Sequence, residues 1–251
     1  MNLEGTNVLL TGGAKGLGSH YCQYLVASGA KVFVADIDEE AGDILTKSIN
    51  DTLGERRCES FRVDTTNEKE TVAMTEAALS FLGSIDALVN NVGFYPHTQF
   101  QQLNFDLWRR VISVNLDSPF LCSRAVVPAM SKAGRGKIVN IATNLVWSGL
   151  PELVHYVAAK AGVVGLTRSL ARALGPMGIT VNALAPGAVA PDPSRLDDIG
   201  LERLEQMVSH QCIQWCERPE DLEGPLAFLV SRDSDFISGQ VLTVDGGLTM
   251  H

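Results

Sequence analysis

NVLLTGGAKGLG, residues 7–18, decides the fold, because an apolar strand runs into a glycine-rich turn and then into the start of a helix. Gly12, Gly16 and Gly18 fall where the strand would turn into the helix. Glycine permits positive φ there and leaves room for a pyrophosphate to approach the backbone and the positive end of the helix. The spacing is G-x-x-x-G-x-G rather than the more familiar G-x-G-x-x-G, and a tight turn alone is the simpler alternative. The order of strand, turn and helix favours a dinucleotide-binding turn.

The composition of the chain is that of an ordinary globular protein. Of its 251 residues, 45% are hydrophobic and 20% are charged, which excludes disorder as the main state. A formal net charge of −9 argues against a nucleic-acid surface, which needs clustered lysine and arginine. Apolar runs are shorter than a bilayer span, and the first residues carry no signal-peptide pattern. We therefore expect a cytoplasmic protein that binds neither nucleic acid nor membrane.

Five cysteines are scattered along the chain, at positions 22, 58, 122, 212 and 216. Cys212 and Cys216 have a spacing that could suggest a metal site, but no second Cys or His pair follows them. Reduced thiols are the simpler interpretation, and we expect no metal.

Short apolar runs alternate with longer stretches of helical character, which predicts βαβ units and a parallel sheet. This gives an α/β fold with a doubly wound parallel sheet of about seven strands in a single domain over 1–251. The expected helices lie near 17–28, 39–53, 67–82, 104–132, 155–174 and 219–231. The expected strands are 7–11, 31–36, 58–63, 86–91, 136–142, 180–185 and 240–245.

The segment near 186–214 interrupts this alternation. It begins PGAVAPDPSR, where three prolines disfavour a regular element, and then becomes amphipathic in LERLEQMV. Insertions of this length in a compact α/β domain are usually functional, so we expect a lid over a substrate site.

An acidic residue closes the second expected strand. Asp36 stands eighteen residues beyond Gly18, where a carboxylate accepts hydrogen bonds from ribose hydroxyls and repels a 2′-phosphate. The alternative is an exposed loop aspartate, a description that fits Asp38. Lys15 in the glycine turn would attract the same phosphate, but Asp36 faces the 2′ position more directly. The pattern therefore favours NAD over NADP.

The stretch YVAAK places Tyr156 four residues before Lys160. On a helix this spacing puts a phenol beside an ammonium group on one face. An interfacial aromatic on an amphipathic helix is the alternative for Tyr156 taken alone.

Together these motifs resemble the classical short-chain dehydrogenase/reductase family, and the resemblance covers essentially the whole chain. TGGAKGLG matches the TGxxxGxG of that family, NNVG at 90–93 stands for NNAG, and YVAAK matches Y-x-x-x-K. APG at 185–187 and the closing GQVLTVDGG follow in the same order. The resemblance implies a Rossmann fold and a homotetramer. It implies cofactor contacts from Gly12, Lys15, Gly16, Leu17, Gly18, Asp36, Ile37, Asp64, Asn91, Gly93, Tyr156, Lys160, Pro186, Gly187 and Val189.

The resemblance also implies a catalytic set of Asn115, Thr143, Tyr156 and Lys160. A free tyrosine, with a pKa of about 10, is a weak base near neutrality. A neighbouring ammonium group and the positive nicotinamide ring both favour phenolate and lower that pKa. Lys160 would also bind the nicotinamide ribose, and Asn115 would support a water that links Lys160 to solvent.

Two positions depart from the family pattern. Thr143 stands thirteen residues before Tyr156, where serine is usual, and it keeps the hydroxyl but adds a methyl group. Ser148 lies nearby, but the count does not favour it. Pro191 replaces a threonine that contacts the nicotinamide carboxamide, so the Val189 backbone would have to make that contact.

The residues expected around the substrate are apolar and aromatic. Besides Thr143 they include Tyr95, Trp147, Leu150 and Met207, with almost no positive charge. This favours a hydrophobic or aromatic secondary alcohol or its ketone as substrate. NNVGFYP, the HY pair and the C-terminal histidine are locally similar to a subgroup with 1-phenylethanol dehydrogenase and pyridoxal 4-dehydrogenase. The alternatives are an NADPH-dependent ketone or 3-oxoacyl reductase, and a catalytically weak NAD-binding sensor.

Overall fold

A computed structural model describes residues 1–189 and 198–250, of which 198–203 are described by their backbone alone. Seven parallel strands form one sheet in the order β3-β2-β1-β4-β5-β6-β7. Their bounds are β1 Asn7–Thr11, β2 Lys31–Asp36, β3 Cys58–Arg62, β4 Ala87–Asn90, β5 Gly136–Ile141, β6 Ile179–Pro186 and β7 Val241–Val244. The predicted doubly wound α/β fold and its seven strands are confirmed.

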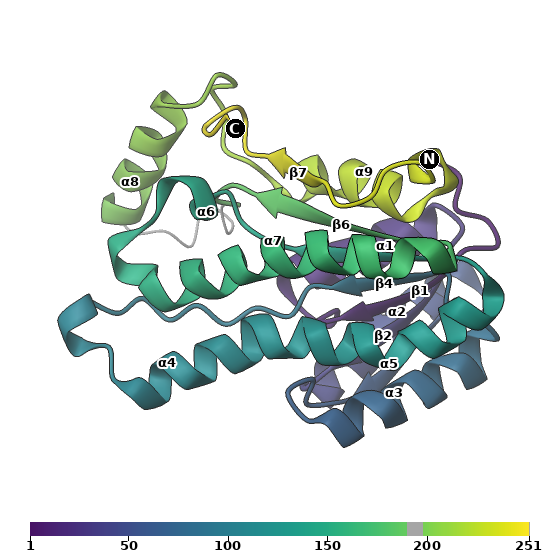
Figure 1. The fold of residues 1–251 in the computed structure, drawn as a ribbon. Helices are drawn as coiled ribbons and strands as arrows, with labels where there is room; N and C mark the ends of the chain where they lie inside the picture. Colours follow the sequence, from purple (N-terminus) through teal and green to yellow (C-terminus); the bar gives the residue numbers. More distant parts are fainter. Residues whose placement is uncertain (190–197, 251) are drawn as a thin grey trace.

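Helices cover both faces of the sheet (Figure 1). One core cluster joins α1 Gly16–Ala27 and α9 Pro219–Val230 to the sheet, with α2 Glu39–Leu53 packed at its margin. The other cluster joins α3 Glu68–Leu82, α5 Ser118–Ala133 and the end of α7 Val154–Leu174. Because both faces are covered, the central strands are buried along their whole length, which explains their continuous apolar sequences.

Strand order reverses between β1 and β4, so the loops that follow these two strands diverge at the carboxyl edge of the sheet. In open α/β sheets a ligand binds in the crevice at this switch point. The glycine-rich turn after β1 and the NNVG segment after β4 therefore face the same crevice.

The helix expected over 104–132 is interrupted. It consists of α4 Phe105–Ile112, a π-helical turn Ser113–Asp117 and α5. The π turn contains Asn115, and such turns are frequent at functional sites.

The amphipathic part of the segment near 186–214 forms α8 Asp198–Ser209. In the view of Figure 1, α8 lies at one end of the molecule, away from the sheet. Pro191 falls outside the described residues, so the expected loss of a carboxamide contact there stays a prediction. Among the described residues, no helix combines the length and apolar character that a membrane span requires.

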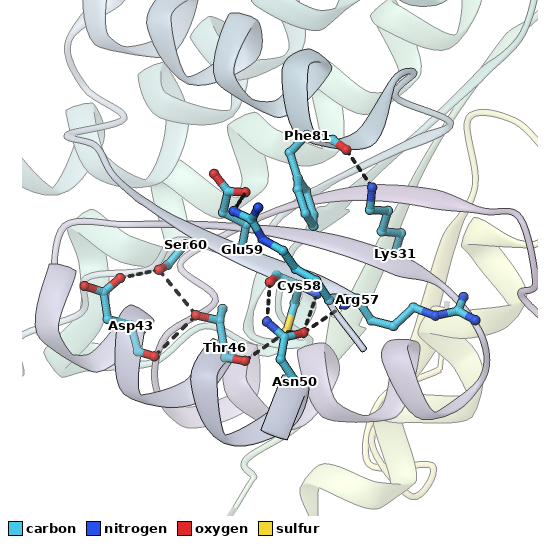
Figure 2. Close-up of polar contacts among 10 residues, drawn as sticks. Lys31, Asp43, Thr46, Asn50, Arg57, Cys58, Glu59, Ser60 and Phe81 are labelled. Atoms are coloured by element: carbon cyan, nitrogen blue, oxygen red, sulfur yellow. Dashed lines mark hydrogen bonds and ion pairs between the residues drawn. The ribbon is translucent and has the colours of Figure 1, made fainter. Parts of the chain in front are cut away.

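Side chains of α2 fix the edge strand β3 (Figure 2). The Asn50 amide donates to the Cys58 carbonyl over 2.8 Å, and its oxygen accepts from the Arg57 and Cys58 N–H groups. Two turns earlier, Asp43 accepts a hydrogen bond from the Ser60 hydroxyl. Asp43 and Ser60 also line the cavity beside the carboxyl end of β2.

Candidate active site

The turn after β1 is shaped for close backbone approach. Gly12 and Gly16 have φ of 61° and 53°, which L-residues with side chains rarely adopt. A Cβ on Gly18 would lie 1.9 Å from the Gly12 carbonyl oxygen, so only glycine fits at position 18. The Asn91 amide after β4 donates to that same carbonyl over 2.7 Å. The turn therefore presents free backbone at the start of α1, a cradle that fits a pyrophosphate.

Asp36 is held at the carboxyl end of β2 by two backbone N–H groups. Its carboxylate accepts from the Ala14 N–H over 2.9 Å and from the Asp38 N–H over 3.0 Å. Lys15, the residue that would attract a 2′-phosphate, instead forms an ion pair with Asp38. That pair raises the pKa of Lys15 and lowers the pKa of Asp38, so the lysine charge is balanced locally.

A cavity of about 300 Å³ lies beside Asp36. Arg62 is the basic residue in its wall, and its guanidinium is paired with Glu70 at 3.1 Å. An anionic 2′-phosphate would thus meet an acidic surface there. The remaining residues lining the cavity include Asp38, Glu39, Asp43, Ser60 and Phe61.

Two further residues predicted to contact the cofactor, Ile37 and Asp64, follow β2 and β3 at the same end of the crevice. The Ile37 side chain, directly after β2, is 63% exposed, which leaves an apolar surface open to a base. The Asp64 carboxylate, after β3, accepts from the N–H and hydroxyl of Thr66 over 2.9 and 2.7 Å. Asp64 therefore shapes its own loop in this structure.

Tyr156 and Lys160 lie in the first two turns of α7. Lys160 is buried, and its ammonium donates to the Ile141 carbonyl at the end of β5 over 2.6 Å. It lies 5.7 Å from the centre of the Tyr156 ring. The predicted juxtaposition of phenol and ammonium is present, and it is tied to the sheet at β5.

The pKa directions at this pair are set by burial. Burial lowers the pKa of Lys160 to about 8. Burial raises the pKa of the Tyr156 phenol above its ordinary value, and the Tyr95 phenol adds a smaller rise. In the protein alone the causes of the Tyr156 shift are burial and Tyr95, so the lowering of its pKa by Lys160 and the nicotinamide ring stays a prediction.

Asn115 links the π-helical turn to the loop that follows NNVG. Its amide donates to the Phe94 carbonyl over 2.7 Å and to the Val111 carbonyl over 2.9 Å, and its oxygen accepts from the Phe94 N–H. Both amide hydrogens are occupied by backbone partners. A water link to Lys160 would therefore have to use the main chain of Asn115.

Thr143 follows β5 and is buried, two residues beyond the carbonyl that accepts from Lys160. Its hydroxyl accepts from the Leu145 N–H over 3.3 Å. Ser148, the alternative, is exposed at the end of α6 Leu145–Ser148. The choice of Thr143 over Ser148 stays a prediction.

Of the four side chains expected at the substrate besides Thr143, Tyr95 lies against the Tyr156 ring. Its ring centre lies 5.4 Å from that of Tyr156, and Tyr95 is 57% exposed. Trp147 packs instead against a small apolar cluster that includes Val164 and Ala183. Leu150 and Met207 are half-buried in the segment before α7 and in α8.

The structure adds residues that the sequence analysis gave no role. The Asn144 N–H donates to the Pro186 carbonyl over 2.9 Å, and the Asn144 amide donates to Asp245 over 3.1 Å. These bonds join the ends of β5, β6 and β7 around the predicted nicotinamide turn at Pro186 and Gly187. Glu217 is buried against the same turn. In sequence, Glu217 stands in CERPED and looks like a solvated charge at a helix start.

Comparisons with known proteins agree with this arrangement. A sequence model of the family described as enoyl-(acyl carrier protein) reductase matches residues 12–249. A cis-4-hydroxycyclohexanecarboxylate dehydrogenase of Sinomonas cyclohexanicum is 36% identical over 96% of this chain and 95% of its own length. A 3-oxoacyl-[acyl-carrier-protein] reductase of Thermotoga maritima is 33% identical over the full length of both chains.

A solved structure from Sinorhizobium meliloti 1021, assigned as a short-chain alcohol dehydrogenase, has a TM-score of 0.92 and 30% identity. It covers 98% of this chain and 97% of its own. Members of the family bind a nicotinamide cofactor, and the glycine cradle, Asp36 and the Tyr156–Lys160 pair provide the groups for one. The chain belongs to the classical short-chain dehydrogenase/reductase family and is an oxidoreductase.

Proposed function

We propose that the protein is an NAD-dependent oxidoreductase that interconverts a hydrophobic or aromatic secondary alcohol and its ketone. The observation that carries the proposal is the Lys160 ammonium, fixed by the Ile141 carbonyl and set beside Tyr156. When bound, NAD would supply the hydride acceptor. The chain would supply proton transfer and alignment of the alcohol.

In this proposal Tyr156 is the general acid and base. Its phenol oxygen takes the hydroxyl proton from the alcohol during oxidation and returns it in the reverse direction. Burial disfavours the phenolate, and the buried Lys160 ammonium offsets this cost by stabilising the phenolate electrostatically. Thr143 holds the substrate oxygen through its hydroxyl. Asn115 positions the loop that leads to Tyr95.

Cofactor choice rests on the β2 end of the crevice. The Asp36 carboxylate is oriented by Ala14 N–H and would accept hydrogen bonds from the adenosine ribose. The pairing of Lys15 with Asp38 removes the main argument for NADP. The proposed contacts in the rest of the groove are the glycine turn with Leu17, then Ile37, Asp64, Asn91, Gly93, Pro186, Gly187 and Val189.

The substrate class rests on the surroundings of Tyr156. Tyr95 presents a half-exposed aromatic ring 5.4 Å from the Tyr156 ring, so an apolar or aromatic group next to the reacting carbon would contact it. We infer that α8, which carries Met207, belongs to a lid over this ring. The relatives from Sinomonas cyclohexanicum carry names that describe dehydrogenases of alicyclic hydroxy acids, which are also secondary alcohols.

A second candidate is an NADPH-dependent 3-oxoacyl reductase, because relatives named as such from Thermotoga maritima and Vibrio cholerae align over the full chain. The acidic cavity beside Asp36 argues against NADPH. Acidic residues would also repel the anionic carrier protein that such a substrate requires.

The test is reduced-cofactor formation by the purified protein across aliphatic, alicyclic and aryl secondary alcohols, with NAD⁺ and NADP⁺ in parallel. Galactose and 4-hydroxycyclohexanecarboxylate complete the panel, because relatives are named for them. We expect turnover of aryl or alicyclic alcohols with NAD⁺. Turnover with NADP⁺ alone, or reduction of 3-oxoacyl thioesters with NADPH, would contradict the proposal.

For assembly, we infer a homotetramer. Phe105 on α4 and Phe120 on α5 are 72% and 43% exposed, which leaves apolar surface on the helices expected to pack against other subunits. Light scattering after size-exclusion chromatography measures the subunit number, and a monomer at micromolar concentration would contradict the inference.

A further inference from the structure

Glu217 is a buried carboxyl that the proposed mechanism does not use. It precedes α9 by two residues, and only 5% of it is exposed. In the described part of the chain, neither of its carboxyl oxygens has a hydrogen-bond partner. Burying an ionised carboxylate without a partner costs free energy, so the neutral form of Glu217 is favoured. A positive charge placed nearby would favour the ionised form instead.

The Glu217 carboxyl lies against the turn that ends β6. A Cβ built on Gly187 would lie 2.7 Å from Oε2 of Glu217 and 2.9 Å from Cβ of Asp245. The turn itself is fixed from two sides, because the Gly187 N–H donates to the Val244 carbonyl and the Asn144 N–H donates to the Pro186 carbonyl. The Glu217 carboxyl therefore lies against the backbone turn that is proposed to hold the nicotinamide.

The groups around Glu217 are acidic or neutral. Asp245 at the end of β7 and Asp221 in α9 both raise its pKa, while the Gly187 N–H lowers it. Tyr21 on α1 faces it with a buried hydroxyl that also has no partner among the described residues. Burial is the largest cause, and the pKa of Glu217 is raised to about 8.

We propose that Glu217 exchanges one proton with solvent according to the charge of the nicotinamide ring, being neutral beside NADH and anionic beside NAD⁺. This inference rests on the proposed function, since it requires the nicotinamide at the Pro186–Gly187 turn. The two cofactor forms have the same phosphates and riboses and differ in the ring charge. The difference between them therefore reports how the titratable groups near the ring, Glu217 among them, respond to that charge.

Coupling of this kind is reciprocal. If NAD⁺ lowers the pKa of Glu217 by one unit, deprotonation of Glu217 tightens NAD⁺ relative to NADH about tenfold. Near pH 7 the carboxyl is mostly protonated in the free protein, so NAD⁺ binding releases a proton and NADH binding does not. Raising the pH through 8 should then favour NAD⁺ over NADH.

The test counts protons released on cofactor binding, by calorimetry near pH 7 in two buffers of different ionisation enthalpy. A Tyr156→Phe background removes the phenol, which would also respond to the ring charge. Glu217→Gln is compared with Glu220→Gln, a change of the same kind at an exposed glutamate three residues away with no role in the site. The quantity compared is proton release with NAD⁺ minus proton release with NADH.

We expect this difference to be a large fraction of one proton in the background protein and in Glu220→Gln, and to fall in Glu217→Gln. An equal difference in Glu217→Gln would overturn the inference while leaving the proposed function intact. Absence of binding by either cofactor would overturn the proposed function, and the inference with it.

Infrared difference spectra of the wild-type protein give a second reading that needs no substitution. NAD⁺ should remove the carbonyl stretch of a protonated carboxyl group, whereas NADH should leave it. Persistence of that band with NAD⁺ saturating the protein would also overturn the inference.

Discussion

At the β2–β3 end of the crevice, three carboxylates around the cavity have partners. Asp36 accepts from two backbone N–H groups, Asp38 pairs with Lys15, and Asp43 accepts from Ser60 (Figure 2). At the β6–β7 end, Glu217 is buried with both oxygens unpartnered in the described structure. The first end therefore presents a fixed negative charge suited to selecting a cofactor. The second end holds the Glu217 carboxyl, whose protonation state we propose to change with the charge of the bound nicotinamide ring.

The largest effect on cofactor affinity is expected from adding a side chain in the glycine turn, because both ends of the crevice act on a cofactor that this turn would hold. Gly18→Ala would put a Cβ 1.9 Å from the Gly12 carbonyl, so the turn must move and NADH affinity should fall by about 10²-fold or more. Titration of NADH fluorescence measures this. Gly224→Ala in α9, where an added Cβ meets nothing within 4 Å, is the control and should bind NADH normally. Unchanged affinity in Gly18→Ala would mean that the cofactor avoids this turn.

Removing the fixed charge at the first end should change the cofactor preference. Asp36→Asn should bring the specificity constants for NADP⁺ and NAD⁺ closer together by about tenfold, since a neutral amide does not repel a 2′-phosphate. Asp43 lines the same cavity and bonds Ser60, a bond that an asparagine can keep. Asp43→Asn should therefore change the cofactor preference less than Asp36→Asn. Equal effects of the two substitutions would indicate that general acidity, not Asp36, selects NAD.

The variable charge at the second end predicts a pH-dependent stability. The pKa of Glu217 is 4.5 in a model compound and about 8 in the folded chain, so the native state holds a proton that the unfolded state loses over this range. Its contribution to the free energy of unfolding is complete below pH 4.5 and falls as the pH rises to about 8, by at most about 1.4 kcal/mol per pH unit. Glu217→Gln should flatten this fall.

Urea unfolding of Glu217→Gln and wild type at a series of pH values measures that slope. Glu220→Gln is again the matched control, because Glu220 is exposed. A wild-type slope that survives in Glu217→Gln would show that another group causes it.

The smallest effect is expected from the conservative substitution Thr143→Ser. Thr143→Ser keeps the hydroxyl and removes one methyl group, so kcat should change by less than about tenfold. Thr143→Val keeps the shape and removes the hydroxyl, and kcat should fall about 10²-fold. Equal activities of Thr143→Ser and Thr143→Val would remove Thr143 from the mechanism.

The sequence predicts the first end of the crevice better than the second, for a physical reason. The glycine turn, Asp36 and the Tyr156–Lys160 pair are set by local backbone geometry and helical spacing, which are visible in short motifs. The doubly wound parallel sheet follows from alternating apolar and helical segments.

Other features depend on contacts distant in sequence. The sequence over 104–132 has the pattern of one continuous helix, but the structure has a π-helical turn at Asn115. The Asn115 side chain there bonds both its own helix, at Val111, and the loop at Phe94. The burial of Glu217 requires that α1, β6 and β7 converge on it, and a glutamate beside arginine and proline ordinarily lies in solvent. Pairing of Lys15 with Asp38 likewise depends on how two loops meet.

The central claim is that Tyr156 transfers the proton in a dehydrogenase with bound NAD, and Tyr156→Phe tests it most directly. Single-turnover oxidation of an active alcohol and NADH binding should be measured on the same preparation of wild type and Tyr156→Phe. We predict that the rate falls by about 10²- to 10⁴-fold while the dissociation constant for NADH stays within about threefold. A rate within tenfold of wild type, with NADH still bound, would contradict the account.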